Sequence, residues 1–328
     1  MKYRRICTAF LSAAGIFLLI IDGQTAIEGA AEGIDLCIRS VIPALFPFFV
    51  LGSLLTATLL GSNVPLLRYL GKLFCVPTGA ESLVLIGFLG GYPVGAQTLA
   101  QAYRSGQLDK KSAERMLAFC NQPGPSFLFG ILGTIFSPGK ACLLWAIQIC
   151  SAFLVSCCIP ASEEVSGIRG QEPITLAAAV MQGIRTMAAV CGWVILFRIG
   201  IAFVNRWFLW ILPDSLQVGI MGLLELANGC LALNRISDPS IRFLICSGML
   251  GFGGICVTMQ TASVAQGLSL RLYFPGKILQ AGFSMLICWV ISPIHKEIPL
   301  ILIPLILICI FSLRKMEKRS GNPLLIGV

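Results

Sequence analysis

Long apolar segments recur along this chain, and each has about the length that a helix needs to cross a bilayer. Crossing the hydrocarbon core takes about 20 mostly apolar residues, or somewhat fewer where polar anchors flank the segment. The expected spans are 6–21, 41–60, 139–160, 175–204, 278–293 and 299–313. Charged residues make up 12% of the chain and hydrophobic residues 56%, whereas soluble domains carry about 25% charged residues. We therefore predict an all-α polytopic membrane protein.

Basic residues cluster at both ends of the chain and in short loops, and they account for the formal net charge of +9. The clusters are 2–5, 104–115, 235–242 and 314–319. By the positive-inside rule these segments face the cytoplasm, and the acidic stretch 161–172 lies outside. The chain is thus expected to be a multi-pass protein of the cell membrane with both termini cytoplasmic. Its basic residues should contact membrane lipid and not nucleic acid.

The same stretch, 161–172, is expected to link two halves, 1–160 and 173–328. Four further apolar segments contain residues that disfavour a continuous helix, notably Gly, Pro, Asn, Gln and Thr. These segments are 82–102, 116–136, 214–233 and 248–267. Broken helices survive in lipid only where protein or water covers the freed backbone, and many secondary transporters build their binding sites from them. We expect broken or re-entrant helices here. The alternative is close helix packing through small residues.

An internal repeat is visible when 87–107 is set above 248–268 without a gap. Gly87, Leu89, Gly90 and Gly106 then fall on Gly248, Leu250, Gly251 and Gly267. Upstream, 38–49 can be set over 184–195. The common order of these matches favours an internal duplication, and two copies of a broken-helix unit are typical of a transporter core.

Three motifs carry a resemblance to a known family. The first is Gly87, Gly91, Tyr92, Pro93 and Gly95; the second is Phe119, Cys120, Asn121, Gly124, Pro125 and Phe127; the third is Glu225, Asn228 and Gly229. Together they resemble the YlbJ group of sporulation integral membrane proteins, within the nucleoside-recognition (Gate) domain family. The sequence departs from that pattern at Gln122–Pro123, where smaller residues are expected.

The resemblance implies a membrane protein of a spore-forming bacterium that is needed for normal spore cortex formation. It also implies an architecture shared with concentrative nucleoside transporters and a ferrous-iron transport protein. Kinship at the level of fold does not identify a substrate.

The candidates for solute binding are polar residues within the apolar segments, together with Pro93, Gly124 and Pro125 at the expected helix breaks. Ionisable and amide groups are costly in a membrane, so their presence there suggests a function. The candidates are Tyr92, Pro93, Gln97, Asn121, Gln122, Gly124, Pro125, Glu225, Asn228, Thr258, Gln260 and Thr261. Glu225 and Asn228 could coordinate a cation or accept hydrogen bonds from a sugar hydroxyl. Equally, Glu225 could be a structural ion-pair partner of Arg198. Asn121 and Gln122 could instead satisfy backbone groups freed by the neighbouring prolines.

Enzymatic function is not expected, because the chain has one histidine and none of its apolar segments carries a recognisable catalytic pairing. Its 14 cysteines are scattered as small apolar residues, without the clustering of a metal site, and we expect no cofactor. A Walker A motif is also missing. Two functions stay open: a secondary transporter or channel for a small polar solute, with a possible coupling cation, or a non-transporting scaffold for spore envelope assembly. The sequence carries no signal for an oligomeric state.

Overall fold

A computed structural model describes residues 2–59, 64–161 and 174–291, and within these ranges every regular element is helical. The longer helices are α1 (Lys2–Ile21), α2 (Gly23–Leu36), α3 (Ile42–Leu59), α4 (Pro65–Phe74), α5 (Glu81–Gly90), α6 (Val94–Arg104), α7 (Lys110–Cys120), α10 (Pro138–Cys158), α11 (Leu176–Trp207), α12 (Asp214–Leu224), α13 (Leu226–Ala232), α14 (Pro239–Phe252), α15 (Gly254–Val264) and α16 (Tyr273–Ile291). Short turns, α8 (Pro125–Phe127) and α9 (Gly133–Ile135), precede α10.

Within the described residues, five helical stretches are long and apolar enough to cross a membrane, which confirms the all-α polytopic class. They are Gly23–Leu59, Pro138–Cys158, Leu176–Trp207, Pro239–Val264 and Tyr273–Ile291. The expected spans at 139–160, 175–204 and 278–293 correspond to three of them. The expected span at 299–313 lies outside the described residues, as does nearly all of the linker 161–172.

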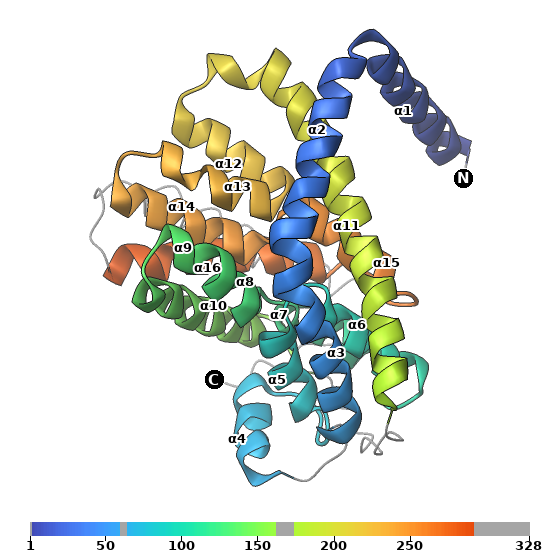
Figure 1. Cartoon of the computed structure of the whole chain (residues 1–328). Coiled ribbons are helices and arrows are strands. Elements are labelled where there is room, and N and C mark those ends of the chain that lie inside the picture. Colours follow the sequence, from blue (N-terminus) through green and yellow to red (C-terminus); the bar gives the residue numbers. More distant parts are fainter. Residues whose placement is uncertain (1, 60–63, 162–173, 292–328) are drawn as a thin grey trace.

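The span expected at 41–60 corresponds to α3, and the helical stretch continues upstream of it through a π-helical turn and α2, so that it begins at Gly23. The spans expected from the sequence do not include α2. In the structure Glu32 of α2 pairs with Arg198 of α11, and Asp22, which caps α2, pairs with Arg206 of α11 at 2.9 Å. Figure 1 shows α2 and α11 running side by side, with α1 projecting away from the rest.

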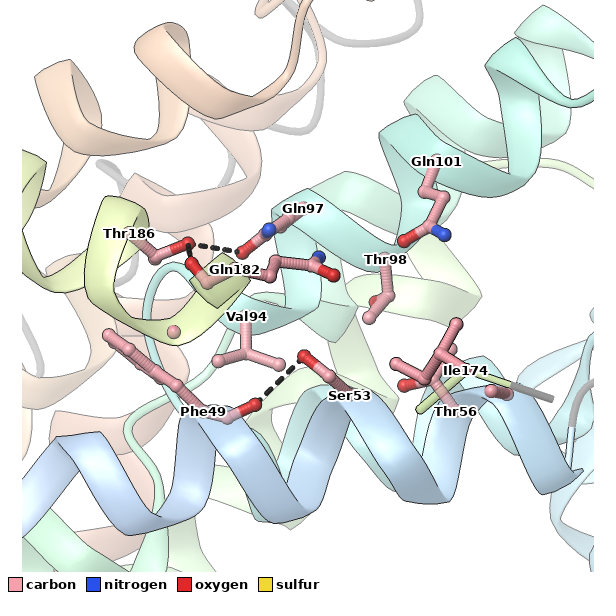
Figure 2. A pocket seen from close by; sticks show the side chains of 12 residues that line it. Phe49, Ser53, Thr56, Val94, Gln97, Thr98, Gln101, Ile174, Gln182 and Thr186 are labelled. Atoms are coloured by element: carbon pink, nitrogen blue, oxygen red, sulfur yellow. Dashed lines mark hydrogen bonds between the residues drawn. The ribbon is translucent and has the colours of Figure 1, made fainter. Parts of the chain in front are cut away.

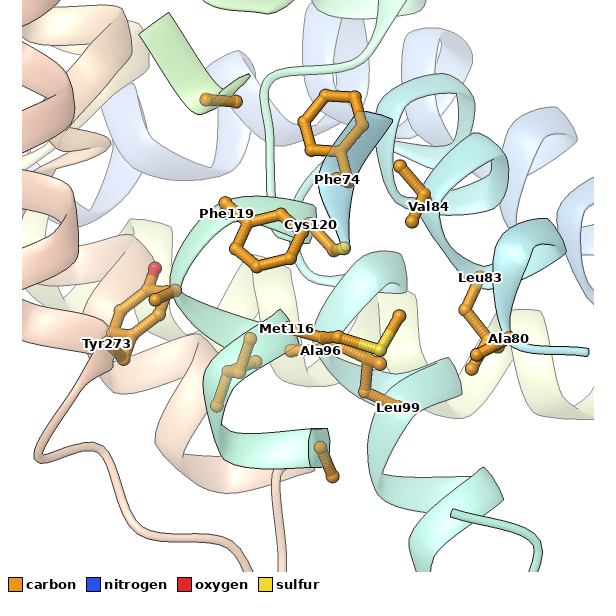
Figure 3. Packing of buried hydrophobic residues seen from close by; sticks show 14 of the residues in the cluster. Phe74, Ala80, Leu83, Val84, Ala96, Leu99, Met116, Phe119, Cys120 and Tyr273 are labelled. Carbon is orange, nitrogen blue, oxygen red and sulfur yellow. The ribbon is translucent and has the colours of Figure 1, made fainter. Parts of the chain in front are cut away.

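Helices from the two expected halves interleave. The long helix α11 packs along α2 and α3, while α16 packs against α7 and α10. A large apolar core joins α5, α6 and α7 to α10 and α16 (Figure 3). Phe74 lies within it, with its ring centroid 5.7 Å from that of Phe119. The inner part of the molecule is therefore a single packed body built from both halves.

Each of the four segments expected to be broken does contain a break. The chain leaves helical geometry at 91–93, between α5 and α6, and at 121–124, after α7. It does so again at Glu225, between α12 and α13, and at Gly253, between α14 and α15. Gly253 takes φ +82, a left-handed conformation that side chains rarely adopt. Local sequence thus dictates where these helices stop.

Candidate functional site

The four helix breaks lie against one another, although they are far apart in sequence. A Cβ atom on Gly124 would lie 2.8 Å from the Cα of Gly91, so these two breaks touch through their backbones. Tyr92, in the first break, donates its hydroxyl hydrogen to the carbonyl of Leu250, one turn before the last break, at 3.0 Å. A Cβ on Gly254 would lie 3.1 Å from the carbonyl oxygen of Gly222, next to the third break. Small residues therefore let the breaks converge.

A cavity of about 50 Å³ lies where the breaks meet. Three breaks contribute directly to its wall, through Tyr92, Gly124 and Glu225, and Gln260 of α15 adds an amide. The rest of the lining is apolar: Val41, Ala44, Leu45, Phe127, Ile131, Val190, Val194, Leu226, Ala227 and Val257. A water molecule needs about 10–15 Å³ of such space. The cavity can therefore hold a few waters or a small ion, with polar groups at a few points only.

Glu225 is the acidic group of this cavity and is 3% exposed. Its carboxylate caps α13, accepting hydrogen bonds from the backbone amides of Ala227 at 3.1 Å and Asn228 at 2.7 Å. The side-chain amide of Asn228 donates to the same carboxylate at 2.7 Å. The cap fixes the orientation of the carboxylate and brings Glu225 and Asn228 together, as the sequence spacing predicts.

An ion pair between Glu225 and Arg198 is not formed. Arg198 pairs instead with Glu32 of α2. Glu32 lies in α2, outside the spans expected from the sequence, so this ion pair was not predicted. Glu225 therefore keeps its carboxylate for the α13 cap and the cavity.

Asn121 and Gln122 bind protein groups rather than the cavity. The side-chain oxygen Oδ1 of Asn121 accepts from the backbone amide of Ala96 at 3.3 Å, and its side-chain amide donates to Thr261 Oγ1 at 2.8 Å. Gln122 donates to the carbonyl of Phe119 at 2.7 Å. Both side chains thus satisfy backbone groups left free by helix breaks, which is the structural alternative that the sequence left open.

Behind Asn121 and Gln122 lies a polar network that sequence reasoning missed. Gln122 and Gln280 of α16 exchange reciprocal amide hydrogen bonds, and Lys277 donates to Gln280 Oε1 at 2.7 Å. Gln280 also donates to Gln148 of α10 at 3.3 Å. Further members of the network are Ser151, Ser247, Tyr273 and Ser284. The available signal was a lysine and a glutamine in the apolar stretch 273–291, but the expected span began one residue after the lysine.

Gln97 lies in a different pocket, between α3, α6 and α11 (Figure 2). Its side-chain oxygen accepts from Thr186 Oγ1 at 3.1 Å. The pocket holds about 10 Å³ and is lined by uncharged groups. Its lining residues are Phe49, Ser53, Thr56, Ala57, Val94, Gln97, Thr98, Gln101, Ile174, Gln182, Gly183 and Thr186. Gln97 therefore does not join the cavity of the breaks.

The remaining candidates are placed by the helices themselves. Thr258 donates to the carbonyl of Gly254 within α15 at 3.1 Å, and Thr261 donates to Tyr273 at 3.3 Å. Pro93 stands just before α6, and Pro125 is the first residue of α8. Among the described residues no three His, Cys, Asp or Glu side chains gather as metal ligands. The structure thus brings Tyr92, Gly124, Glu225 and Gln260 together and leaves the other candidates around them.

Comparison with known proteins gives one informative similarity. The chain is similar to a protein of Bacillus subtilis (strain 168) named sporulation integral membrane protein YlbJ, at 23% identity over 337 aligned residues. The alignment covers 87% of this chain and 82% of the relative. No family model matches the chain. No solved structure matches it either.

Proposed function

We propose that this chain is a sporulation-associated membrane protein that transports a small polar solute or ion. The observation that carries the proposal is the convergence of three helix breaks on one cavity, with α15 beside them and a carboxylate in the cavity wall. Interrupted helices meeting inside a membrane are the arrangement from which secondary transporters form solute sites. The sporulation context rests on the similarity to the B. subtilis protein.

The size and chemistry of the cavity narrow the class of solute. A volume of about 50 Å³ accommodates an ion or a few waters. Drug-sized ligands occupy much larger pockets, so a nucleoside would require the breaks to move apart. The carboxylate of Glu225 favours a cation over an anion. The proposed solute is therefore a small cation or a small neutral molecule. The resemblance to the nucleoside-recognition family would then reflect a shared architecture and not a shared substrate.

The proposed duplication has support from helix boundaries. With Gly87 paired to Gly248, the last residue of α5, Gly90, pairs with Gly251, and α14 ends at Phe252. Gly106 pairs with Gly267, and both take left-handed φ values, +69 and +88. Two copies of a helix, break and helix unit would then line the cavity from opposite halves. We also propose that the protein lies in the cell membrane with both termini in the cytoplasm.

The experiment is thermal unfolding of the purified protein in detergent, followed by tryptophan fluorescence, against monovalent and divalent cations, nucleosides and cell-wall precursors. Glu225→Gln and Asn121→Ala are measured beside the wild type. Each variant is compared with its own ligand-free midpoint, because both changes also affect structure. Gln97→Ala is the control, because Gln97 lines the separate pocket.

A ligand that raises the wild-type and Gln97→Ala midpoints, but not that of Glu225→Gln, supports a solute site at the breaks. Asn121→Ala should weaken the effect by loosening the break after α7. If no compound shifts the wild type, and the folded Glu225→Gln and Asn121→Ala variants still support sporulation, the site proposal fails. The scaffold function then becomes the better explanation.

A further inference from the structure

Lys277 is the most unusual buried charge outside the cavity. It lies in α16, a candidate membrane span, and its relative exposure is 0%. Charged side chains inside membranes are expensive and are usually paired or functional. Across residues 2–59, 64–161 and 174–291, no carboxylate lies within ion-pair distance of its amine. The positive charge must therefore be stabilised in another way.

Two oxygen atoms and one aromatic ring surround the ammonium of Lys277, which has three N–H groups to direct toward them. Lys277 Nζ donates to the backbone carbonyl of Asn121 at 3.0 Å and to Gln280 Oε1 at 2.7 Å. It also lies 5.1 Å from the centroid of the Tyr92 ring, within the usual range of a cation–π contact. Two oxygens and an aromatic face form a cage suited to a monovalent cation.

The backbone carbonyl of Asn121 lies where broken-helix proteins can bind a cation. Helix α7 ends at Cys120, so the Asn121 carbonyl follows directly from the carbonyl end of a half-helix. That end carries the negative partial charge of the helix dipole. Unwound carbonyls and half-helix ends of this kind coordinate coupling cations in broken-helix transporters. Gly276 lets α16 approach closely, since a Cβ there would lie 2.9 Å from the Cβ of Ala118.

We propose that the ammonium of Lys277 permanently occupies a monovalent-cation site formed by the break after α7. The tethered charge takes the place of a free alkali ion. Through Tyr92, which also lines the cavity, it connects this site to the proposed solute site. For transport, this proposal rests on the proposed function. If the chain moves a solute, that movement would need no alkali ion at this position.

The test removes the ammonium and asks whether an added cation replaces it. Lys277→Ala leaves both oxygens and the ring and opens space. Lys277→Met fills the space of the stem and leaves no room, so it is the matched control. Unfolding midpoints are measured for the full-length protein in Na⁺, K⁺, methylammonium and choline at equal ionic strength.

We expect Na⁺ or methylammonium to raise the midpoint of Lys277→Ala by roughly 5 °C over choline, as for saturating binding at one site. The wild type and Lys277→Met should show no difference between these salts. If Lys277→Ala is unstable in choline, it is purified in Na⁺ and then exchanged, and unfolding on exchange also supports the site.

A Lys277→Ala protein that behaves alike in all four salts overturns the inference, as does one that cannot be recovered in any of them. Equal cation responses in Lys277→Ala and Lys277→Met overturn it too, because the cation would then bind elsewhere. These outcomes do not bear on the proposed function, whose test is the ligand response of Glu225→Gln.

Discussion

At the scale of single residues, several buried polar side chains bind backbone groups left free where helices end. Arg115 shows this most fully. Its guanidinium donates to the carbonyls of Phe74 and Cys75 at the end of α4, and to those of Ser156 and Ile159 at the end of α10. These carbonyls lie among apolar side chains, where an unpaired polar group is costly. One side chain of α7 therefore joins two helix ends, those of α4 and α10.

Replacement of Arg115 should accordingly weaken the fold. Arg115→Met leaves several carbonyls without donors, and we expect the free energy of unfolding to fall by about 1–3 kcal/mol. Arg68→Met is the control, because Arg68 is on the exposed side of α4. Denaturant unfolding of the two purified variants measures the difference. Equal losses for both would contradict the structural role assigned to Arg115.

Two acidic helix caps provide a second comparison at this scale. Glu225 caps α13 inside the protein, whereas Asp238 caps α14 at the surface, accepting from the amide of Ser240 at 2.7 Å. Loss of a cap costs about 0.5–2 kcal/mol, and a buried amide left unpaired adds to that cost. We expect Glu225→Gln to lower the unfolding midpoint more than Asp238→Asn. A larger effect of Asp238→Asn would mean that the Glu225 cap is not needed for stability.

At the scale of elements, small residues decide which helices can approach closely. On α2, Gly29 and Gly33 face α11, and a Cβ on Gly29 would lie 2.9 Å from the Cβ of Ala202 and 3.0 Å from the Cα of Ile199. Helices in membranes associate largely through such close packing, because lipid offers no hydrophobic drive between them. The close contact of α2 with α11 thus depends on glycines on the face of α2 that meets α11.

A larger side chain at Gly29 should separate the two helices. Gly29→Val is expected to destabilise the protein by about 1–3 kcal/mol through overpacking. Gly200→Ala on α11 is the control, since a Cβ at Gly200 meets nothing within 4 Å. That control should be neutral or slightly stabilising, because alanine favours helix over glycine. Thermal unfolding of both variants tests the contact, and an unchanged midpoint for Gly29→Val would rule out close packing there.

At the scale of the whole molecule, the two halves form one body. The contacts of α11 with α2 and α3, and of α16 with α7 and α10, cross between the halves. Much of the apolar core is shared in the same way. Neither half can complete its packing without the other.

This arrangement predicts the behaviour of a split protein. Residues 1–166 and 167–328, expressed separately, should aggregate or be degraded, because each exposes surfaces that the other covers. Expressed together, they should co-purify through a tag on one fragment and unfold in one transition. Monodisperse, folded material from either fragment alone would show that the halves are independent domains.

The sequence by itself determined the class of fold and where the helices break. Apolar length calls for membrane-spanning helices, and Gly, Pro and Asn act on the backbone within a few residues, so the breaks near Gly91, Asn121, Glu225 and Gly253 were predictable. Only the tertiary structure decided which groups meet there. Arg198 pairs with Glu32, and Lys277 is bound to the carbonyl of Asn121. Such partners lie more than 150 residues apart, and only the packing of whole helices brings them together.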